Sequence, residues 1–364
     1  MIEASARVGR LPRLSGASWA GIVVLAVVLA VIPLFYSNDY ILTVMITAGI
    51  VLVLNTSWNF VLGIAGVWNF GQLAIFALGG YGAGLLMLHT GLPGGVCVLL
   101  GGAISSGISI LLAFPTLRLY GIYTSLLTFS FAAVVQLVIV NDGSGLTGGS
   151  FGLDTVKGLY PGLAPNAQIH AYYWTVLAVI VVATYAVARI RSSRLGIALQ
   201  TVRDAPAYAA ARGVNPLKYR VLAFAISGFI AGIAGALYVS FNQSITPSVM
   251  GLTPMSIDVT MLVIGGLATI GGPAIGTALL TVMQTSLVDY PGIQLTILGT
   301  MLLLIVVFVP GGIVGLIARI KSRLSRWVAE EERPGESPPE EPRTHAVTFD
   351  MPDQQPSEGN YPDV

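Results

Sequence analysis

Long apolar stretches without Asp, Glu, Lys or Arg recur along most of the chain. The hydrocarbon core of a bilayer is about 30 Å thick and a helix rises about 1.5 Å per residue, so about 20 apolar residues are enough to span it. Each stretch has roughly that length and therefore predicts a membrane-spanning helix. The nine stretches are 18–36, 41–62, 69–90, 94–114, 121–140, 172–188, 221–241, 259–284 and 293–317.

Two regions are interrupted by glycines. The stretch 259–284 is too long for one plain helix, and it contains two Gly-Gly pairs and a proline, which removes a backbone donor. We expect it to form two segments or a re-entrant piece, which brings the total to about ten. A second glycine-rich region covers 63–84, and broken segments in both halves are typical of a transport pathway. The alternative is that these glycines, like those of the small-residue stripe at 228–236, only permit close helix packing. The predicted hinge residues are Gly71, Gly265, Gly266, Gly271, Gly272 and Pro273.

The composition supports a membrane protein. Hydrophobic residues make up 54% of the 364 residues, charged residues make up 10%, and the mean hydropathy is +0.80. A soluble domain has about 25% charged residues, so a cytosolic enzyme, a secreted disulfide scaffold and a disordered protein are excluded. Cys97 is the single cysteine and the three histidines are far apart in sequence. No disulfide framework and no metal site are therefore expected.

Basic residues predict the orientation, because short loops rich in Lys and Arg stay in the cytoplasm. Seven lie in 189–220, three in the leader 1–17 and four in 319–326, but only one in 141–171. We therefore expect a transmembrane domain at 18–318, with the 189–220 loop and both termini cytoplasmic and the 141–171 loop external. The tail 319–364 is first basic, then acidic and proline-rich, with ten of the 17 acidic residues from Glu330 onward. Such a tail is predicted to be disordered.

The apolar stretches contain no obvious group for ion coupling. No Lys, Arg, Asp or Glu lies inside them, and Asp258 only borders one. Carriers driven by ion gradients usually place a carboxylate in the membrane. The Gly-x-x-x-x-Gly-Lys-Ser/Thr loop of ATPases is also absent. The chain is therefore expected to be a transport subunit and not an enzyme, either passive or driven by a partner, with no cofactor of its own and no nucleic-acid partner.

A few uncharged polar side chains lie in or beside the apolar stretches and could line a path for a small substrate. Two of them are four residues apart and so share one helix face. The alternative is that they form hydrogen bonds between helices, worth about 0.6–2 kcal/mol each. The candidate path residues are Asn55, Asn59, Asn69, Gln72, Thr128, Ser130 and Gln136.

The basic 189–220 loop is the best candidate for a coupling device. Leu195, Leu199 and Val202 recur at helical spacing, which predicts an amphipathic helix on the membrane face. A second helix of about eight residues is expected after it, with Asp204 as N-cap, Pro206 in the first turn and a glycine at its end. So short a helix is marginal alone and must be held by the membrane body or by a docked protein. The alternative is a plain solvated connector.

Several segments together resemble one family. They are 55–86, 117–123, 146–153, 193–199, 204–238 and 265–276, the last reading Gly-Gly-Leu-Ala-Thr-Ile-Gly-Gly-Pro-Ala-Ile-Gly. As a set they are similar to the permeases of branched-chain amino-acid ABC importers, specifically the M-type subunit, over about residues 41–320. The resemblance implies an all-α polytopic membrane protein with a fold like that of type II ABC importers.

The resemblance also implies partners and a location. They are an H-type permease subunit, two cytosolic ABC ATPases that bind ATP and Mg²⁺, a periplasmic substrate-binding protein and the lipid of a bacterial inner membrane. A short Ala-rich cytoplasmic helix would dock on an ATPase, although the family often has Glu at the position of Asp204. The coupling residues so implied are Asp204, Ala209, Ala210, Arg212, Gly213 and Asn215. A urea or short-amide importer permease, a passive channel for a small neutral solute and a gradient-driven carrier are the alternatives.

Overall fold

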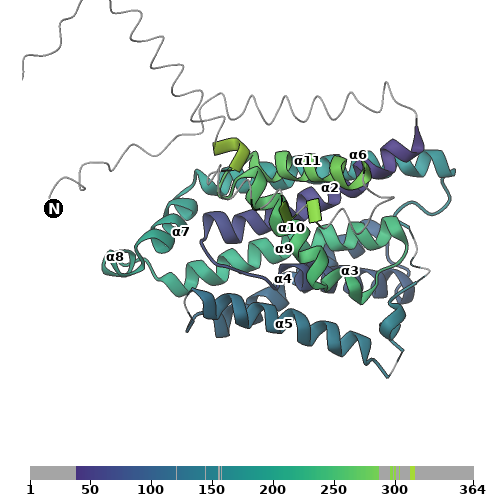
Figure 1. Cartoon of the computed structure of the whole chain (residues 1–364). Coiled ribbons are helices and arrows are strands. Elements are labelled where there is room, and N and C mark those ends of the chain that lie inside the picture. Colours follow the sequence, from purple (N-terminus) through teal and green to yellow (C-terminus); the bar gives the residue numbers. More distant parts are fainter. Residues whose placement is uncertain are drawn as a thin grey trace, which may run out of the picture. The chain divides into compact units, whose positions relative to one another are not determined.

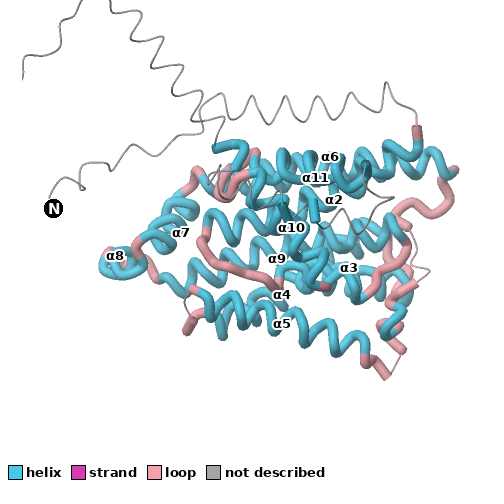
Figure 2. The backbone as a smooth tube through the Cα atoms, in the orientation of Figure 1, coloured by secondary structure: helices cyan, strands magenta, loops and turns pink. Residues whose placement is uncertain are grey.

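The computed structural model describes residues 38–119, 121–143, 145–154, 156, 158–286, 296–297, 299–300, 303 and 312–315. The regular elements of this part are helices, with one isolated antiparallel bridge between Leu153 and Ile245 (Figures 1 and 2). The predicted leader, the first apolar stretch at 18–36 and the tail at 319–364 lie outside the described residues, as does most of the stretch at 293–317.

Six helices in the described part are long and apolar enough to cross a membrane. They confirm the stretches predicted between 41 and 241. They are α2 (Asp39–Asn59, continued by the π-helical turn η1, Phe60–Ile64), α3 (Gln72–His89), α4 (Gly94–Thr116), α5 (Ile122–Val140), α6 (Pro165–Arg191) and α9 (Pro216–Asn242).

Helices α6 and α9 extend beyond their apolar stretches into the adjacent connections. Each begins at a proline, whose fixed φ suits the first helical position and whose missing N–H costs nothing there. The connections are therefore shorter than the predicted loops at 141–171 and 189–220. The first contains the 3-10 turn η2 (Gly149–Phe151), and the second contains α7 (Arg194–Asp204) and α8 (Pro206–Ala211).

Helix α9 lies in the middle of the bundle and packs closely on α3 and α4 (Figure 1). Small residues make this approach possible. A Cβ atom on Gly232 would lie 2.5 Å from the Cβ of Ser105, and one on Gly235 would overlap the carbonyl oxygen of Phe76. The hydroxyl of Ser105 donates to the carbonyl of Ile75 at 2.8 Å. The glycines of the 228–236 stripe are thus packing residues, as the sequence predicted.

The stretch predicted at 259–284 is divided into α10 (Leu252–Gly265) and α11 (Gly272–Ser286), which pack on each other and on α2. The break between them covers residues 266–271, as expected from the glycines. Helix α10, however, begins seven residues earlier than the stretch, because the 3-10 turn η3 (Pro247–Met250) leads directly into it.

Asp258 corrects one sequence inference. It does not border an apolar segment but lies inside α10, where it is buried with 7% exposure. The sequence reading stopped at Val259 because a charged residue was taken as the edge of a membrane segment. The described part of the membrane body therefore does contain an acidic side chain, and no hydrogen bond or ion pair of Asp258 is seen among the described residues.

Candidate functional site

Helices α7 and α8 project together at one end of the bundle, beyond the ends of α6 and α9 (Figure 1). We call this end the basic end, because the cations of 189–220 gather there in sequence. Leu199 and Val202 are buried against the bundle, as the amphipathic pattern predicted, but Leu195 is exposed. Helix α7 is thus anchored to the membrane body by two of its three predicted apolar residues.

Helix α8 is a six-residue helix with a well-defined end. The N–H of Val214 donates to the carbonyl of Ala209 at 3.0 Å, and the N–H of Gly213 donates to that of Ala210 at 3.0 Å. This pair of bonds is a Schellman motif, which requires a left-handed residue, and Gly213 has φ +79°. Its Cα faces open space, since no atom lies within 4 Å of an added Cβ.

Most of α8 remains exposed. Ala209 is its one buried residue, while Ala210 and Arg212 are exposed, and the guanidinium of Arg212 lies 5.1 Å from the ring centroid of Tyr208. A cation held over an aromatic ring keeps its charge and gains rigidity. The helix therefore presents a small, stiff and positively charged surface.

Asp204 and Asn215, two of the predicted coupling residues, have structural contacts of their own. The prediction that Asp204 is the N-cap of α8 is wrong, because Ala205 occupies that position. Asp204 ends α7, and its carboxylate is engaged by Arg203 through Nε at 2.8 Å and Nη2 at 3.2 Å. Asn215 caps α9 by accepting from the N–H of Leu217 at 3.0 Å. A docking role for either residue stays a prediction.

The predicted hinge residues lie at two places, the α10–α11 break and the start of α3, and their steric demands differ. Gly265, Gly272 and Pro273 are buried where α10 and α11 meet, and a Cβ on Gly265 would overlap the carbonyl oxygen of Gly272. Gly266 has φ +111°, which only glycine adopts readily. Gly271 lies in open space, and Gly71 precedes α3, where a Cβ would be 2.9 Å from the carbonyl oxygen of Thr128. Their role as hinges stays a prediction.

Asn55 and Asn59 both face the α10–α11 break and its flanking helices. The amide of Asn59 accepts from the N–H of Ala268 at 2.9 Å and donates to the carbonyl of Thr269 at 2.7 Å. One turn earlier, Nδ2 of Asn55 donates to Oγ1 of Thr277 at 3.1 Å, while its Oδ1 has no partner among the described residues. Both side chains are buried. They hold the broken segment to α2.

A second polar cluster lies between α2, α3 and α9. Nδ2 of Asn69 donates to Oε1 of Gln72 at 2.9 Å, and Nε2 of Gln72 donates to Oγ of Ser57 at 3.0 Å. Oγ of Ser227 lies 3.4 Å from the same nitrogen. Nearby, the N–H of Phe70 donates to Oγ1 of Thr128 at 3.0 Å. These buried groups satisfy one another and fix the start of α3.

The last two candidate path residues lie on α5, away from that cluster. Nε2 of Gln136 donates to the carbonyl of Pro247 at 3.2 Å and so ties α5 to η3. Ser130 is exposed on the outer face of α5. The seven candidates therefore do not converge on one cavity, and their assignment to a substrate path stays a prediction.

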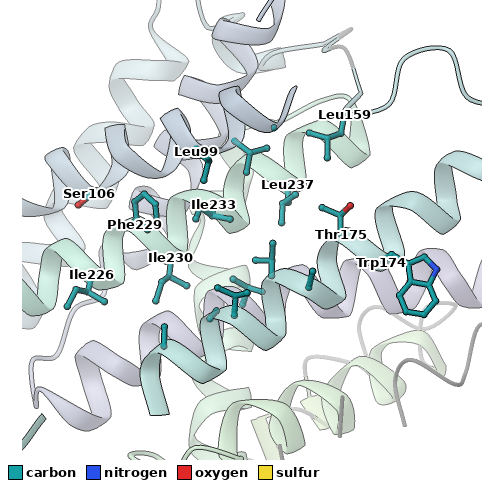
Figure 3. A pocket seen from close by; sticks show the side chains of 18 of the residues that line it. Leu99, Ser106, Leu159, Trp174, Thr175, Ile226, Phe229, Ile230, Ile233 and Leu237 are labelled. Atoms are coloured by element: carbon teal, nitrogen blue, oxygen red, sulfur yellow. The ribbon is translucent and has the colours of Figure 1, made fainter. Parts of the chain in front are cut away.

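An apolar pocket of about 1010 Å³ lies between α4, α6 and α9 (Figure 3). Its wall includes Phe229, Ile233 and Leu237 from α9 and Trp174 from α6, and none of the residues that line it is charged. A zwitterionic solute would lose its hydration there without a charged partner. The pocket is thus suited to apolar groups, and none of the seven candidate path residues lines it. No group of three or more His, Cys, Asp or Glu residues that could hold a metal occurs in the described part of the chain.

The sequence reasoning missed three groups that the structure brings together. Arg203 was counted only as a topogenic cation, yet its Nη1 donates to the carbonyl of Gly63 at 2.6 Å. Gly63 in turn lies against the backbone of Ala268. The available signals were weak: an arginine next to an aspartate, and a glycine four residues after an asparagine.

The bundle of apolar helices, the broken α10–α11 pair and the exposed basic helices define a polytopic α-helical membrane protein of the transport-permease class. The family model of the branched-chain amino acid transport system permease component matches residues 40–310. The chain therefore belongs to that permease family, and it is a transport subunit and not an enzyme.

Individual relatives agree with this assignment. The chain is 25% identical to the high-affinity branched-chain amino acid transport system permease protein LivM of Salmonella typhimurium, over 72% of this chain and 67% of the relative. It is 24% identical to LivM of Escherichia coli, over 78% of this chain and 72% of the relative. A probable LivH permease of Methanocaldococcus jannaschii is 35% identical over 27% of this chain and 30% of the relative. No solved structure matches significantly.

Proposed function

We propose that this chain is the M-type permease subunit of an ATP-driven importer for branched-chain amino acids in a bacterial inner membrane. The observation that carries the coupling part is the exposed, rigid and basic α8 at the end of the bundle. The substrate class is supported by the names of the related permeases, which are transporters of branched-chain amino acids.

The proposed complex contains an H-type permease subunit, two cytosolic ATPases that bind ATP and Mg²⁺, and a periplasmic substrate-binding protein. In this assembly α8 docks on one ATPase. Its exposed Ala210, the stiffened Arg212 and the left-handed Gly213 form the contact, and the buried Ala209 anchors the helix to the bundle. A six-residue helix can transmit force only if both of its ends are held, and the Schellman motif and the Arg203–Asp204 fork supply those ends.

The proposed orientation places the basic end in the cytoplasm. Seven basic residues against one acidic residue in 189–220 support this by the positive-inside rule. Both termini are then cytoplasmic, and the connection that contains η2 faces the periplasm. An ATPase and α8 are thereby on the same side of the membrane, as docking requires.

Movement of α8 on ATP binding would shift the permease pair between states open to either side. Allosteric coupling of this kind needs an element with two arrangements that both sites bias. The α10–α11 break is the candidate element, because its backbone is not helical and is held in place by contacts such as those of Asn59.

Reconstitution into proteoliposomes tests this function. The chain is assembled with its genomic neighbours, and uptake of labelled leucine is measured with and without ATP. We expect uptake that requires ATP, both permeases and the binding protein. Flux through the chain alone without ATP would identify a passive channel. Uptake of urea or short amides in place of leucine would change the proposed substrate. Loss of uptake on addition of an uncoupler at constant ATP would identify a gradient-driven carrier.

A further inference from the structure

We propose that Arg203 is a positioning residue that links the cytoplasmic helices α7 and α8 to the α10–α11 break through Gly63 and Asn59. This inference rests on the proposed function, since it concerns how ATP-driven movement of α8 reaches the membrane segment. It assigns to Arg203 and Asn59 a role in transport that differs from docking and from substrate contact.

The first step of the link joins α7 to the end of α2. Nη1 of Arg203 donates to the carbonyl oxygen of Gly63 at 2.6 Å, across 140 positions of sequence. The other edge of the guanidinium is fixed by the two bonds to Asp204 at 2.8 and 3.2 Å. The aliphatic part of the side chain lies on Gly66, whose φ is +72° and whose Cα has no room for a Cβ beside it. The arginine is therefore held along its whole length.

The second step passes through the π-helical turn η1. Gly63 lies in this turn, where a Cβ would be 2.5 Å from the backbone nitrogen of Ala268 and 2.7 Å from Oδ1 of Asn59. The backbone of Gly63 is thus contacted by Arg203 on its carbonyl and by the break on its Cα. π-helical turns inside α-helices occur frequently at functional sites. No flexible side chain separates the two contacts.

The third step fixes the break itself. The amide of Asn59 accepts from the N–H of Ala268 at 2.9 Å and donates to the carbonyl of Thr269 at 2.7 Å. An amide is the uncharged side chain that offers a donor and an acceptor side by side. Ala268 has φ +60°, a conformation that is unfavourable for a residue with a Cβ. The break is therefore held in a strained arrangement that Asn59 stabilises.

Together these contacts form a continuous connection from α7 to the break, made largely of backbone groups. A displacement of α7 that moves the guanidinium changes the position of the Gly63 carbonyl, and Gly63 cannot move without displacing Ala268. Packed interiors respond to such shifts by switching between discrete arrangements, because they have little free volume.

The experiment compares three variants in the full reconstituted complex. Arg203→Ala removes the link, and Arg203→Lys keeps one donor for Gly63 but cannot form the fork to Asp204. Arg194→Ala is the matched control, since Arg194 is an exposed arginine of the same helix with no contact seen among the described residues. Three quantities are measured for each: co-purification of the ATPase, the rate of ATP hydrolysis, and leucine taken up per ATP hydrolysed.

We expect Arg203→Ala to retain the ATPase and to hydrolyse ATP while uptake per ATP falls about tenfold, a size typical of coupling between two sites. Arg203→Lys should give an intermediate value, and Arg194→Ala should match the unmodified complex. A nitroxide spin label on Cys introduced at the exposed Ser256 of α10 should change its spectrum on ATP binding in the control but not in Arg203→Ala.

Two results would overturn the link. Equal uptake per ATP in Arg203→Ala and Arg194→Ala would show that nothing passes through Arg203. Loss of the ATPase from Arg203→Ala would place the residue in docking and refute the link, while leaving the proposed function intact. Failure of the proposed function is distinguishable from both, because the unmodified complex would then show no ATP-dependent uptake at all.

Discussion

Replacing Asn59 by leucine should destabilise the permease far more than the same change at Asn55. Both side chains are buried in α2 and lie one helical turn apart. Leucine at position 59 would leave the N–H of Ala268 and the carbonyl of Thr269 without partners. An unsatisfied buried polar group costs about 1–3 kcal/mol, and these two groups are only partly buried, so the free energy of unfolding should fall by about 1–3 kcal/mol.

Leucine at position 55 has a much smaller predicted effect. It removes the bonds from Nδ2 to Oγ1 of Thr277 and to Sδ of Met261, but it also removes Oδ1 of Asn55, a buried acceptor with no partner among the described residues. These two terms largely offset each other, so the change should be within about 1 kcal/mol. Denaturant unfolding in detergent micelles measures both variants by tryptophan fluorescence, to which the fully buried Trp58 contributes.

Two outcomes of this comparison would refute the reasoning. A loss at Asn55→Leu equal to or larger than that at Asn59→Leu would show that the unpartnered oxygen is not a penalty. A loss below about 0.6 kcal/mol at Asn59→Leu, the average for a polar contact between membrane helices, would show that the break does not depend on this amide.

Three further predictions concern other parts of the chain. Gly213→Val should weaken ATPase co-purification and uptake, because a β-branched residue is strained at φ +79°. Gly213→Asn should retain both, because Asn tolerates that conformation. An equal loss in the two variants would contradict the argument. Gly232→Ala should cost about 1–3 kcal/mol of unfolding free energy through its clash with α4, while Gly107→Ala, which has open space, should be neutral or stabilising. Asp258→Asn should leave ATP-driven uptake and its insensitivity to uncouplers unchanged, because a buried amide needs no counter-charge; loss of uptake in an intact complex would revive ion coupling.

The membrane helices could be predicted because their signal is local. Length, apolarity and the absence of charge are properties of each segment alone, so the ranges between 41 and 241 are close to those of the structure. The ends were less accurate where a helix continues into polar residues. Pro165 and Pro216 begin helices that apolarity alone places several residues later.

The roles of the polar residues could not be predicted, because they depend on partners far away in sequence. Asn59 contacts residues 209 and 210 positions later, and Gln72 contacts Ser227, 155 positions later. A polar side chain in an apolar helix is compatible with a substrate path and with a structural bond alike. Only the position of the break relative to α2 shows which partners Asn59 has.

The broken helix and the buried amide on the facing helix depend on each other, because the amide forms the hydrogen bonds that the break leaves open. A break leaves N–H and carbonyl groups without helical partners, and those that water does not reach need partners from the protein. A hydroxyl or a carboxylate cannot supply a donor and an acceptor at the spacing of one peptide unit, whereas an amide can. The glycines at 265–272 and the asparagine at 59 were interpreted from the sequence as separate signals. The hydrogen bonds of Asn59 to Ala268 and Thr269 show that they belong together.

The hydrogen bonds of Arg203 show that it does more than set the orientation of the chain by its charge. The positive-inside rule treats Lys and Arg alike, since it depends only on charge near the membrane. The contacts of Arg203 depend on geometry, because three of its donors serve an aspartate and a backbone carbonyl at once. A lysine would preserve the orientation of the chain and lose the fork. The orientation of the permease and its internal link can therefore be separated by one conservative substitution, which charge patterns alone could never distinguish.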